Sequence, residues 1–288
     1  MVRRLKSTEA VKQIRSHPRH SLFLVMWRFL HSPPASGAEN MALDEALMHW
    51  ARGTGEWAFR VYSWSRPTLS LGRNQTARGG YDRAQMEARE IDVVRRPTGG
   101  RAILHDREVT YSVTGRVDDA GDLLESYERI NRLLVAGLGA LGVESVVVGP
   151  ADAARAAGAE PRAQPGLLPC FHHPSSGEIT LDGRKLAGSA QWRSDGALLQ
   201  HGSILIDDDQ MQLASLMTQP APPMPRPATL HDALGRVPDE CEVAGALFAA
   251  VREWADPDAR ELEIDDALAD CARALRSRYL DDAWTWRR

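Results

Sequence analysis

A cysteine and a lysine offer the clearest chemistry in this sequence. Cys170 precedes Phe171 and lies 15 positions before Lys185. The thiolate of a cysteine is a strong nucleophile, and a nearby ammonium group lowers the pKa of the thiol from its usual value of about 8.5. The two residues therefore indicate a cysteine nucleophile that Lys185 activates, provided that the fold brings the two side chains together.

The segment from residue 178 to residue 191 is typical of a β-hairpin. Asp182 and Gly183 stand between two hydrophobic runs, and this dipeptide favours a two-residue turn in which both central residues have positive φ. We therefore expect Lys185 on a strand close to the turn. A lysine in such a place is most often an exposed strand residue, which is the alternative to a catalytic role.

A second candidate segment is a glycine turn within residues 95–106. Gly99 and Gly100 follow a predicted strand and Thr98. Paired glycines let a backbone approach a ligand closely, and their amide groups can face a carbonyl, phosphate or acyl oxygen. A plain turn between strands would need no ligand. More polar residues flank this turn than a hairpin requires, namely Arg96, Arg101, His105 and Asp106.

A third candidate segment is the strand predicted at residues 199–206, with His201, Gly202 and Ser203 in its middle. A glycine that interrupts a strand indicates a bulge or the close approach of a ligand. His201 is either a ligand-binding residue or a hydrogen-bonded core histidine, and the pattern does not separate the two. Ser203 lacks the strand-turn-helix context of a hydrolase nucleophile.

The first elements of the chain are a strand and a capped helix. Residues 27–30 predict a strand, and Ser36 and Glu39 have the spacing of a capping box that opens a helix over 37–51. We expect Asn40 and Asp44 on a solvated polar face of that helix, with the alternative that they face a site.

Strands and helices then alternate, and the strands outnumber the helices, so we expect a mixed sheet. Strands at 59–64 and 68–71 are expected to form a hairpin through the turn at Arg66 and Pro67. The other predicted elements are a helix at 81–90, strands at 92–96, 102–104 and 109–113, a long helix at 122–141, and helices at 242–255 and 264–278.

We predict three parts in the chain. Residues 1–25 form a basic N-terminal arm without fixed structure, residues 26–219 form the catalytic domain, and residues 220–288 form a small helical C-terminal extension. Residues 149–169 are rich in Ala, Gly and Pro and are expected to be a loop that could wall or cover the site.

Composition narrows the class of protein. A chain of 288 residues with 43% hydrophobic content can bury a full core, and a net charge of −4 argues against a nucleic-acid partner. Besides Cys170, the cysteines are Cys241 and Cys271, which are expected to be small buried residues. Their spacing favours neither a disulfide framework nor a metal site, and this usage fits a reducing cytoplasm. The longest early apolar run, residues 22–27, is too short to span a membrane.

The order of the three candidate segments resembles the biotin and lipoate protein ligase superfamily, from about residue 27 to residue 286. Within it, Pro169, Cys170 and Phe171 ahead of the Lys185 hairpin look like the hallmark of the octanoyltransferases. The resemblance implies a mixed, largely antiparallel sheet flanked by helices. It also implies an acyl tunnel beside the glycine turn.

The same resemblance implies an activity. An octanoyl group would move from octanoyl-acyl carrier protein to a lysine of a lipoyl-accepting protein, typically the glycine cleavage H protein, with no cofactor and no metal. Cys170 would carry the acyl group as a thioester, and Lys185 would lower the pKa of its thiol. The expected substrate-binding residues are Arg96, Thr98, Gly99, Gly100, Arg101, His105, Gly188, Ser189, Ala190, His201 and Gly202.

Three alternatives remain. An ATP-dependent lipoate ligase would use the corresponding lysine to hold an acyl-adenylate; such ligases typically lack the cysteine and more often have a third glycine where this chain has Arg101. An amidotransferase would move the acyl group between two carrier proteins. A module that only binds acyl groups would need neither Cys170 nor Lys185.

Overall fold

The computed structural model describes residues 25–144, 146–148, 178–220 and 225–288. The strands of its larger sheet are β1 (Trp27–His31), β2 (Trp57–Tyr62), β6 (Glu108–Arg116), β7 (Val146–Val148), β8 (Ile179–Leu181), β9 (Arg184–Ser194), β10 (Ala197–Leu205) and β11 (Arg260–Glu261). A smaller sheet contains β3 (Thr68–Leu71), β4 (Asp92–Arg95) and β5 (Ile103–His105). The helices are α2 (Gly37–Thr54), α3 (Arg83–Ala88), α4 (Val117–Ala120), α5 (Leu123–Ala140), α7 (Leu230–Leu234), α8 (Glu240–Trp254), α9 (Asp266–Leu280) and α10 (Asp282–Thr285), with a 3₁₀ helix, η2, at Gln210–Leu216.

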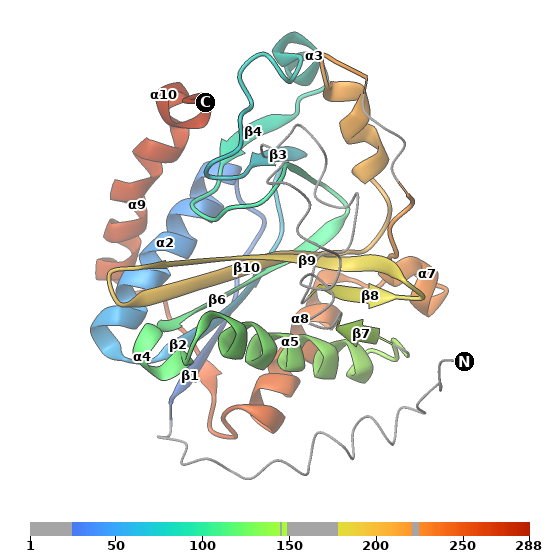
Figure 1. Ribbon diagram of the computed structural model, residues 1–288. Helices are drawn as coiled ribbons and strands as arrows, with labels where there is room; N and C mark the ends of the chain where they lie inside the picture. The colour runs from blue at the N-terminus through green and yellow to red at the C-terminus, as the bar shows by residue number, and fades with distance from the viewer. Residues whose placement is uncertain (1–24, 145, 149–177, 221–224) are drawn as a thin grey trace.

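The larger sheet has the strand order β11-β1-β2-β6-β10-β9-β8-β7 (Figure 1). Strand β1 is parallel to β11 and β2, and the other neighbours are antiparallel. The predicted mixed, largely antiparallel sheet flanked by helices is therefore confirmed.

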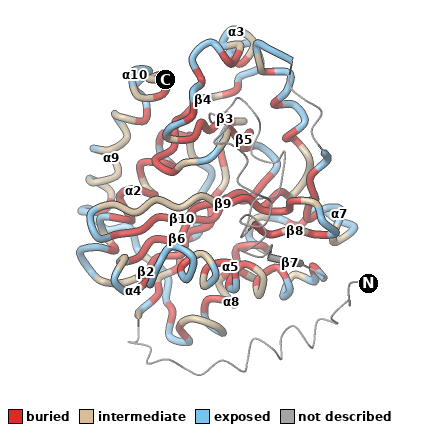
Figure 2. The backbone as a smooth tube through the Cα atoms, viewed as in Figure 1, coloured by how far each residue is buried: buried red, intermediate tan, exposed pale blue. Residues whose placement is uncertain are grey.

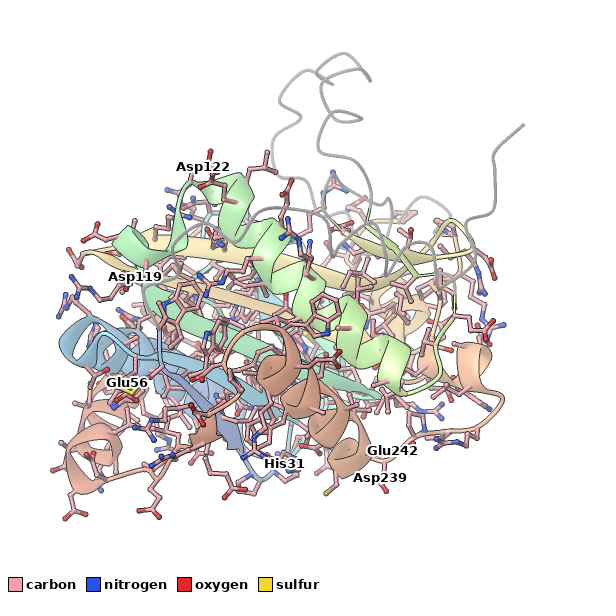
Figure 3. All side chains as sticks on the ribbon, turned by 90° about the horizontal axis from the view of Figure 1, so that it is seen from below. His31, Glu56, Asp119, Asp122, Asp239 and Glu242 are labelled. Carbon is pink, nitrogen blue, oxygen red and sulfur yellow. The ribbon has the colours of Figure 1, made fainter. Side chains whose placement is uncertain are left out.

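Helices cover both faces of this sheet. Helices α5 and α8 lie on one face, and α2 lies on the other with α9 outside it (Figure 1). In Figure 3 the N-caps Asp122 of α5 and Asp239 of α8 lie at opposite ends of the pair, so these two helices run antiparallel. Figure 2 shows buried backbone through the central strands and more exposed backbone along α9. The core thus lies between the sheet and its two helical layers.

The predicted hairpin of residues 59–64 and 68–71 is wrong. Strand β2 pairs with β1 and β6, whereas β3 pairs with β4 and β5 in the other sheet. Every residue of both strands is buried. Such strands have neighbours on both sides, and their hydrophobic pattern does not say which strands those neighbours are.

Local signals were more reliable. The capping box of Ser36 and Glu39 opens α2 as predicted. Asp182 and Gly183 have φ of 50° and 74° in the turn between β8 and β9, which confirms the predicted hairpin. A second turn of the same kind, Asp195-Gly196, joins β9 to β10 and was not predicted.

The C-terminal residues contribute helices to both helical layers and one strand to the larger sheet. Helices α8 and α9 confirm the two predicted helices, and β11, which was not predicted, pairs with β1 at the sheet edge. The division at residue 219 stays a prediction. Cys241 is exposed at the start of α8, so its expected burial is wrong, and Cys271 is half-buried. Among the described residues, no helix has the length and apolar character needed to cross a membrane.

Candidate active site

A cavity between the two sheets brings the three candidate segments together. It contains about 430 Å³ of space, part of it open to solvent, within the roughly 300–1,000 Å³ range of small-molecule sites. The sequence-predicted residues that line it are Arg96, Gly100, His105, Gly188, Ser189, Ala190, His201 and Gly202. The cavity lining that the sequence did not predict is Met41, Tyr62, Trp64, Ser70, Ile103, Thr110 and Ser203.

The cavity lining is exposed at Gly100 and half-exposed along β9, and it is buried at its aromatic residues. Ser189 and Ala190 on β9 are half-exposed. Tyr62 and Trp64 at the other end are buried, with exposed fractions of 0% and 9%. The Trp64 ring stacks on His105 with the centroids 4.1 Å apart. An extended apolar group that enters beside β9 would therefore run across the strands and end against aromatic rings.

Arg96 holds the glycine turn in place. Its guanidinium group donates to the carbonyl oxygens of Ser70, Gly99 and Arg101 at 2.7 to 3.1 Å. Gly100 has φ of 94°, a conformation that favours glycine. These contacts assign Arg96 a positioning role for the turn, and the Arg101 side chain is half-exposed.

The turn also needs the glycine that directly follows β3. A Cβ atom on Gly72 would lie 1.9 Å from the carbonyl oxygen of Gly100, so the two backbones are in direct contact. Gly202 in β10 is similarly confined, because its Cβ atom would lie 2.3 Å from the carbonyl oxygen of Gly188. The glycine that interrupts the predicted strand is thus explained by the packing of neighbouring backbone.

His201 belongs to a buried polar chain. Its Nδ1 lies 3.1 Å from Oδ2 of Asp44, and its Nε2 lies 2.6 Å from Oγ1 of Thr98. Asp44 also accepts from Arg60 and Ser112, each at 2.8 Å to Oδ1. Helix α2 is therefore connected through His201 to the residue that precedes the two glycines.

The charge states in this chain follow from burial and hydrogen bonding. Burial lowers the pKa of His201, although Asp44 opposes the shift. Burial disfavours the charged form of Asp44, yet the hydrogen bond from His201 and the charge of Arg60 hold the pKa of Asp44 below its usual value. We infer a neutral His201 that donates from Nδ1 to Asp44 and accepts at Nε2 from the Thr98 hydroxyl.

The prediction that Asn40 and Asp44 lie on a solvated face is wrong. Both are fully buried, because Arg60 stands in the middle of the buried strand β2 and needs acceptors. Its guanidinium donates to the side chains of both residues at 2.8 Å. The signal that could have found this network is the arginine itself, since a charged residue inside an apolar strand requires a buried partner.

His105 is part of a second polar group at the closed end of the cavity. Its Nε2 lies 2.7 Å from Oγ of Ser70, and its Nδ1 lies 3.2 Å from Oε1 of Glu108 without the alignment of a hydrogen bond. Glu108 accepts from Trp64 Nε1 at 2.8 Å. The contacts hold the stacked Trp64 and His105 rings as a fixed end wall.

Lys185 is buried and paired, so it is not an exposed strand residue. Its exposed fraction is 2%, and its Nζ donates to Oε1 of Glu178 at 2.5 Å. Sequence reasoning missed Glu178 as a site residue. A buried lysine needs a carboxylate, and Glu178 is an acid of the same hairpin. Cys170 lies outside the described residues, as does the expected loop at 149–169.

Among the described residues, no group of three or more His, Cys, Asp or Glu side chains is arranged to hold a metal ion. Hydrogen-bond donors and an apolar end wall define the site instead. Its open end is adjacent to the strand that carries Lys185, because Gly188 follows Lys185 by three residues, about 10 Å along β9.

Comparison with known proteins places the chain in a family. Residues 36–251 match the family model of the lipoyl protein ligase A/B catalytic domain. The chain belongs to this family. The sequence-based resemblance to the octanoyltransferases of the lipoate pathway is confirmed, and the protein is an acyltransferase enzyme.

Curated relatives carry the more specific likeness. The octanoyltransferase LipM of Kyrpidia tusciae is 38% identical over 283 residues, which cover 91% of this chain and 99% of that protein. That of Carboxydothermus hydrogenoformans is 45% identical over 188 residues, which cover 64% of this chain and 66% of that protein.

Solved structures support the fold. A lipoate-protein ligase A bound with ATP has a TM-score of 0.73 at 24% identity and covers 91% of this chain and 99% of its own. A putative lipoate protein ligase from T. acidophilum with bound lipoic acid has a TM-score of 0.72 at 23% identity, covering 91% of this chain and all of its own.

Proposed function

We propose that this protein transfers an octanoyl group from octanoyl-acyl carrier protein to a lysine of a lipoyl-accepting protein of the glycine cleavage H type. Cys170 carries the acyl group as a thioester between the two steps. The observation that supports this proposal most is the cavity closed by Tyr62 and Trp64, in a chain whose curated relatives are octanoyltransferases.

The reaction proceeds in two balanced steps. The Cys170 thiolate attacks the donor thioester carbonyl, and the donor sulfur leaves as a thiolate, so one thioester bond forms as another breaks. The acceptor lysine amine then attacks the Cys170 thioester, forms an amide and releases the thiolate, while the amine loses a proton. The first step exchanges one thioester for another, and the second forms the more stable amide, so neither step requires ATP.

The described residues have separate roles in this scheme. The octanoyl tail occupies the cavity and ends against Trp64 and His105. The amide groups of Gly99 and Gly100 face the acyl oxygen and stabilise its negative charge in the tetrahedral intermediates. The Asp44, His201 and Thr98 chain fixes the position of that turn. Lys185 acts on Cys170 by a hydrogen bond from its ammonium group.

Intact-mass analysis tests the proposal. After mixing with octanoyl-acyl carrier protein and without ATP, the wild-type protein should gain one octanoyl group, and peptide mapping should place it on Cys170. Cys170→Ala should gain none, whereas the matched control Cys241→Ala should behave as wild type. Full transfer to H protein by Cys170→Ala would refute the thioester mechanism. Acyl-adenylate formation from free lipoate and ATP would favour a lipoate ligase instead.

A further inference from the structure

A second cavity lies beside the acyl site. It contains about 650 Å³ of space, part of it open to solvent, between α2, the far end of β9 and the C-terminal helices. We call it the arginine–tryptophan pocket. The lining residues on which its chemistry depends are Arg52, Arg73, Arg278, Trp192 and Trp284.

Positive charge gathers around this pocket. Burial, followed by repulsion from Arg287 and Arg288, lowers the pKa of Arg95 to about 10. The pKa of Arg287 is lowered by burial and by the charges of neighbouring arginines, Arg73 first among them. Guanidinium groups depress one another's pKa in this way only where they lie close together. Arg278 is part of the same group.

The carboxylates near the pocket do not balance this charge. Glu45 lines it but already accepts from Arg278 and from Tyr279, and Asp195 also lines it. The side chains of Arg73 and Arg287 donate instead to backbone carbonyl groups, those of Pro97 and Arg73 respectively. Among the described residues, Nε of Arg278 and Nε of Arg287 are buried without a hydrogen-bond acceptor. Arg278 lines the pocket and Arg287 lies over the ring of its Trp284, so donors without acceptors are present at the pocket wall.

Aromatic rings lie against the guanidinium groups. Cζ of Arg73 lies 4.8 Å from the ring centroid of Trp192. Cζ of Arg278 and Cζ of Arg287 lie 4.8 and 3.9 Å from the ring centroid of Trp284. A guanidinium group presents its N–H donors in one plane, and two of them can donate to the same tetrahedral anion. Paired hydrogen bonds of this kind suit phosphate, and a single point charge cannot form them.

The pocket continues the open end of the acyl cavity. Gly188 and Ala190 line the acyl cavity, and Trp192, two residues further on the same face of β9, lines the pocket. Two residues of a strand span about 7 Å. The backbone amide of Arg73 also donates to the Thr98 carbonyl at 2.7 Å, so the pocket and the glycine turn share an edge.

We propose that the arginine–tryptophan pocket binds the phosphate of the acyl donor, the phosphodiester of the prosthetic arm that carries the octanoyl thioester. The inference rests on the proposed function. The other substrate approaches with a lysine ammonium, which clustered guanidinium groups repel, so the charge assigns the pocket to the donor. With the tail in the cavity and the thioester at β9, the arm follows β9 toward Trp192.

Two donors that differ only in the phosphate test the proposal. The wild-type KM for octanoyl-4′-phosphopantetheine should be at least tenfold lower than that for octanoyl-pantetheine. Arg73→Gln and Arg287→Gln should each shrink this ratio to below threefold by raising the KM of the phosphorylated donor, with kcat unchanged. The matched control Arg236→Gln, an exposed arginine paired with Glu242, should keep the wild-type ratio. Equal KM values for both donors in the wild type, or equal losses for both donors in Arg73→Gln, would overturn the proposal.

A binding measurement separates this proposal from the proposed function. Tryptophan fluorescence of the full chain is titrated with 4′-phosphopantetheine and with pantetheine, neither of which carries an acyl group. Tighter binding of the phosphorylated compound, lost in Arg73→Gln, supports the pocket even if no octanoyl transfer is seen, in which case the proposed function alone fails. If octanoyl transfer occurs but neither binding nor KM favours the phosphorylated compound, the proposed phosphate site is wrong and the proposed function stands.

Discussion

Removing one partner of the buried pair of Lys185 and Glu178 should destabilise the protein more than removing both. Nζ of Lys185 lies 2.5 Å from Oε1 of Glu178, and the two side chains are 1% and 9% exposed. A charge left without its partner in such a place typically costs about 3–5 kcal/mol. Replacing both residues by apolar ones of similar size is often neutral or stabilising, because neither charge then has to leave water.

The loss in free energy of unfolding that a single substitution causes has an upper limit. The lysine left in Glu178→Gln can lose its proton, which at pH 7 costs about 4.6 kcal/mol from a usual pKa of about 10.4. Because the amide oxygen of the introduced glutamine can still accept a hydrogen bond, we expect a loss of about 3 kcal/mol. Lys185→Met leaves the buried Glu178 carboxylate without the Lys185 ammonium, and we expect a loss of about 3–5 kcal/mol. The double variant Glu178→Leu/Lys185→Met should lose no more than about 2 kcal/mol.

Urea unfolding at pH 7 measures these costs from the shift of the midpoint at constant m. The loss in Glu178→Gln should shrink as pH rises from 7 to 9, because removing the proton of Lys185 then costs less free energy. If the double variant costs the sum of the two single losses, the pair is not coupled and the reasoning is wrong.

Three further changes have defined outcomes. Gly72→Ala should lower the free energy of unfolding by about 1–3 kcal/mol and slow transfer, because its Cβ atom meets the backbone of the glycine turn. Gly53→Ala is the control: a Cβ atom there points into open space on α2, so the variant should gain up to about 1 kcal/mol. Thermal melting measures both changes. Because burial lowers the pKa of His201, the stability that the neutral histidine contributes is present above about pH 6.5 and should be lost as pH falls below that value. In His201→Gln the free energy of unfolding should therefore change less between about pH 6.5 and 5. In Glu178→Gln the pH at which Cys170 is half-alkylated by iodoacetamide should shift downward, and no shift would show that the carboxylate does not influence the thiol.

Features set by neighbouring residues could be predicted from the sequence. The capping box of Ser36 and Glu39 and the Asp182-Gly183 turn involve contacts within a few positions, and each appears where the pattern placed it. The pairing of β2 and β3 could not be predicted in the same way. Both strands are buried throughout, so they lack the alternation that distinguishes one face from another, and the short Arg66-Pro67 link wrongly suggested a hairpin.

The site was predictable to the extent that its residues lie in motifs. The glycine turn and His201 were found because glycines and polar groups interrupt apolar strands. Asp44 was expected on a solvated face, with a site as the alternative, because its partner His201 lies 157 positions away. Glu178 was missed as a site residue because nothing in the sequence sets it apart from other acids. Two signals were present nonetheless, since Arg60 in a buried strand and Lys185 beside a core both require an acid.

The Glu178 carboxylate changes how Lys185 can activate a thiol. An isolated ammonium acts on a thiolate through its full charge, whereas an ammonium–carboxylate pair acts as a dipole whose field falls off more steeply with distance. Long-range attraction from Lys185 is therefore a weak explanation for a lowered pKa of the Cys170 thiol. A direct hydrogen bond from Nζ to the sulfur is the arrangement that would still work.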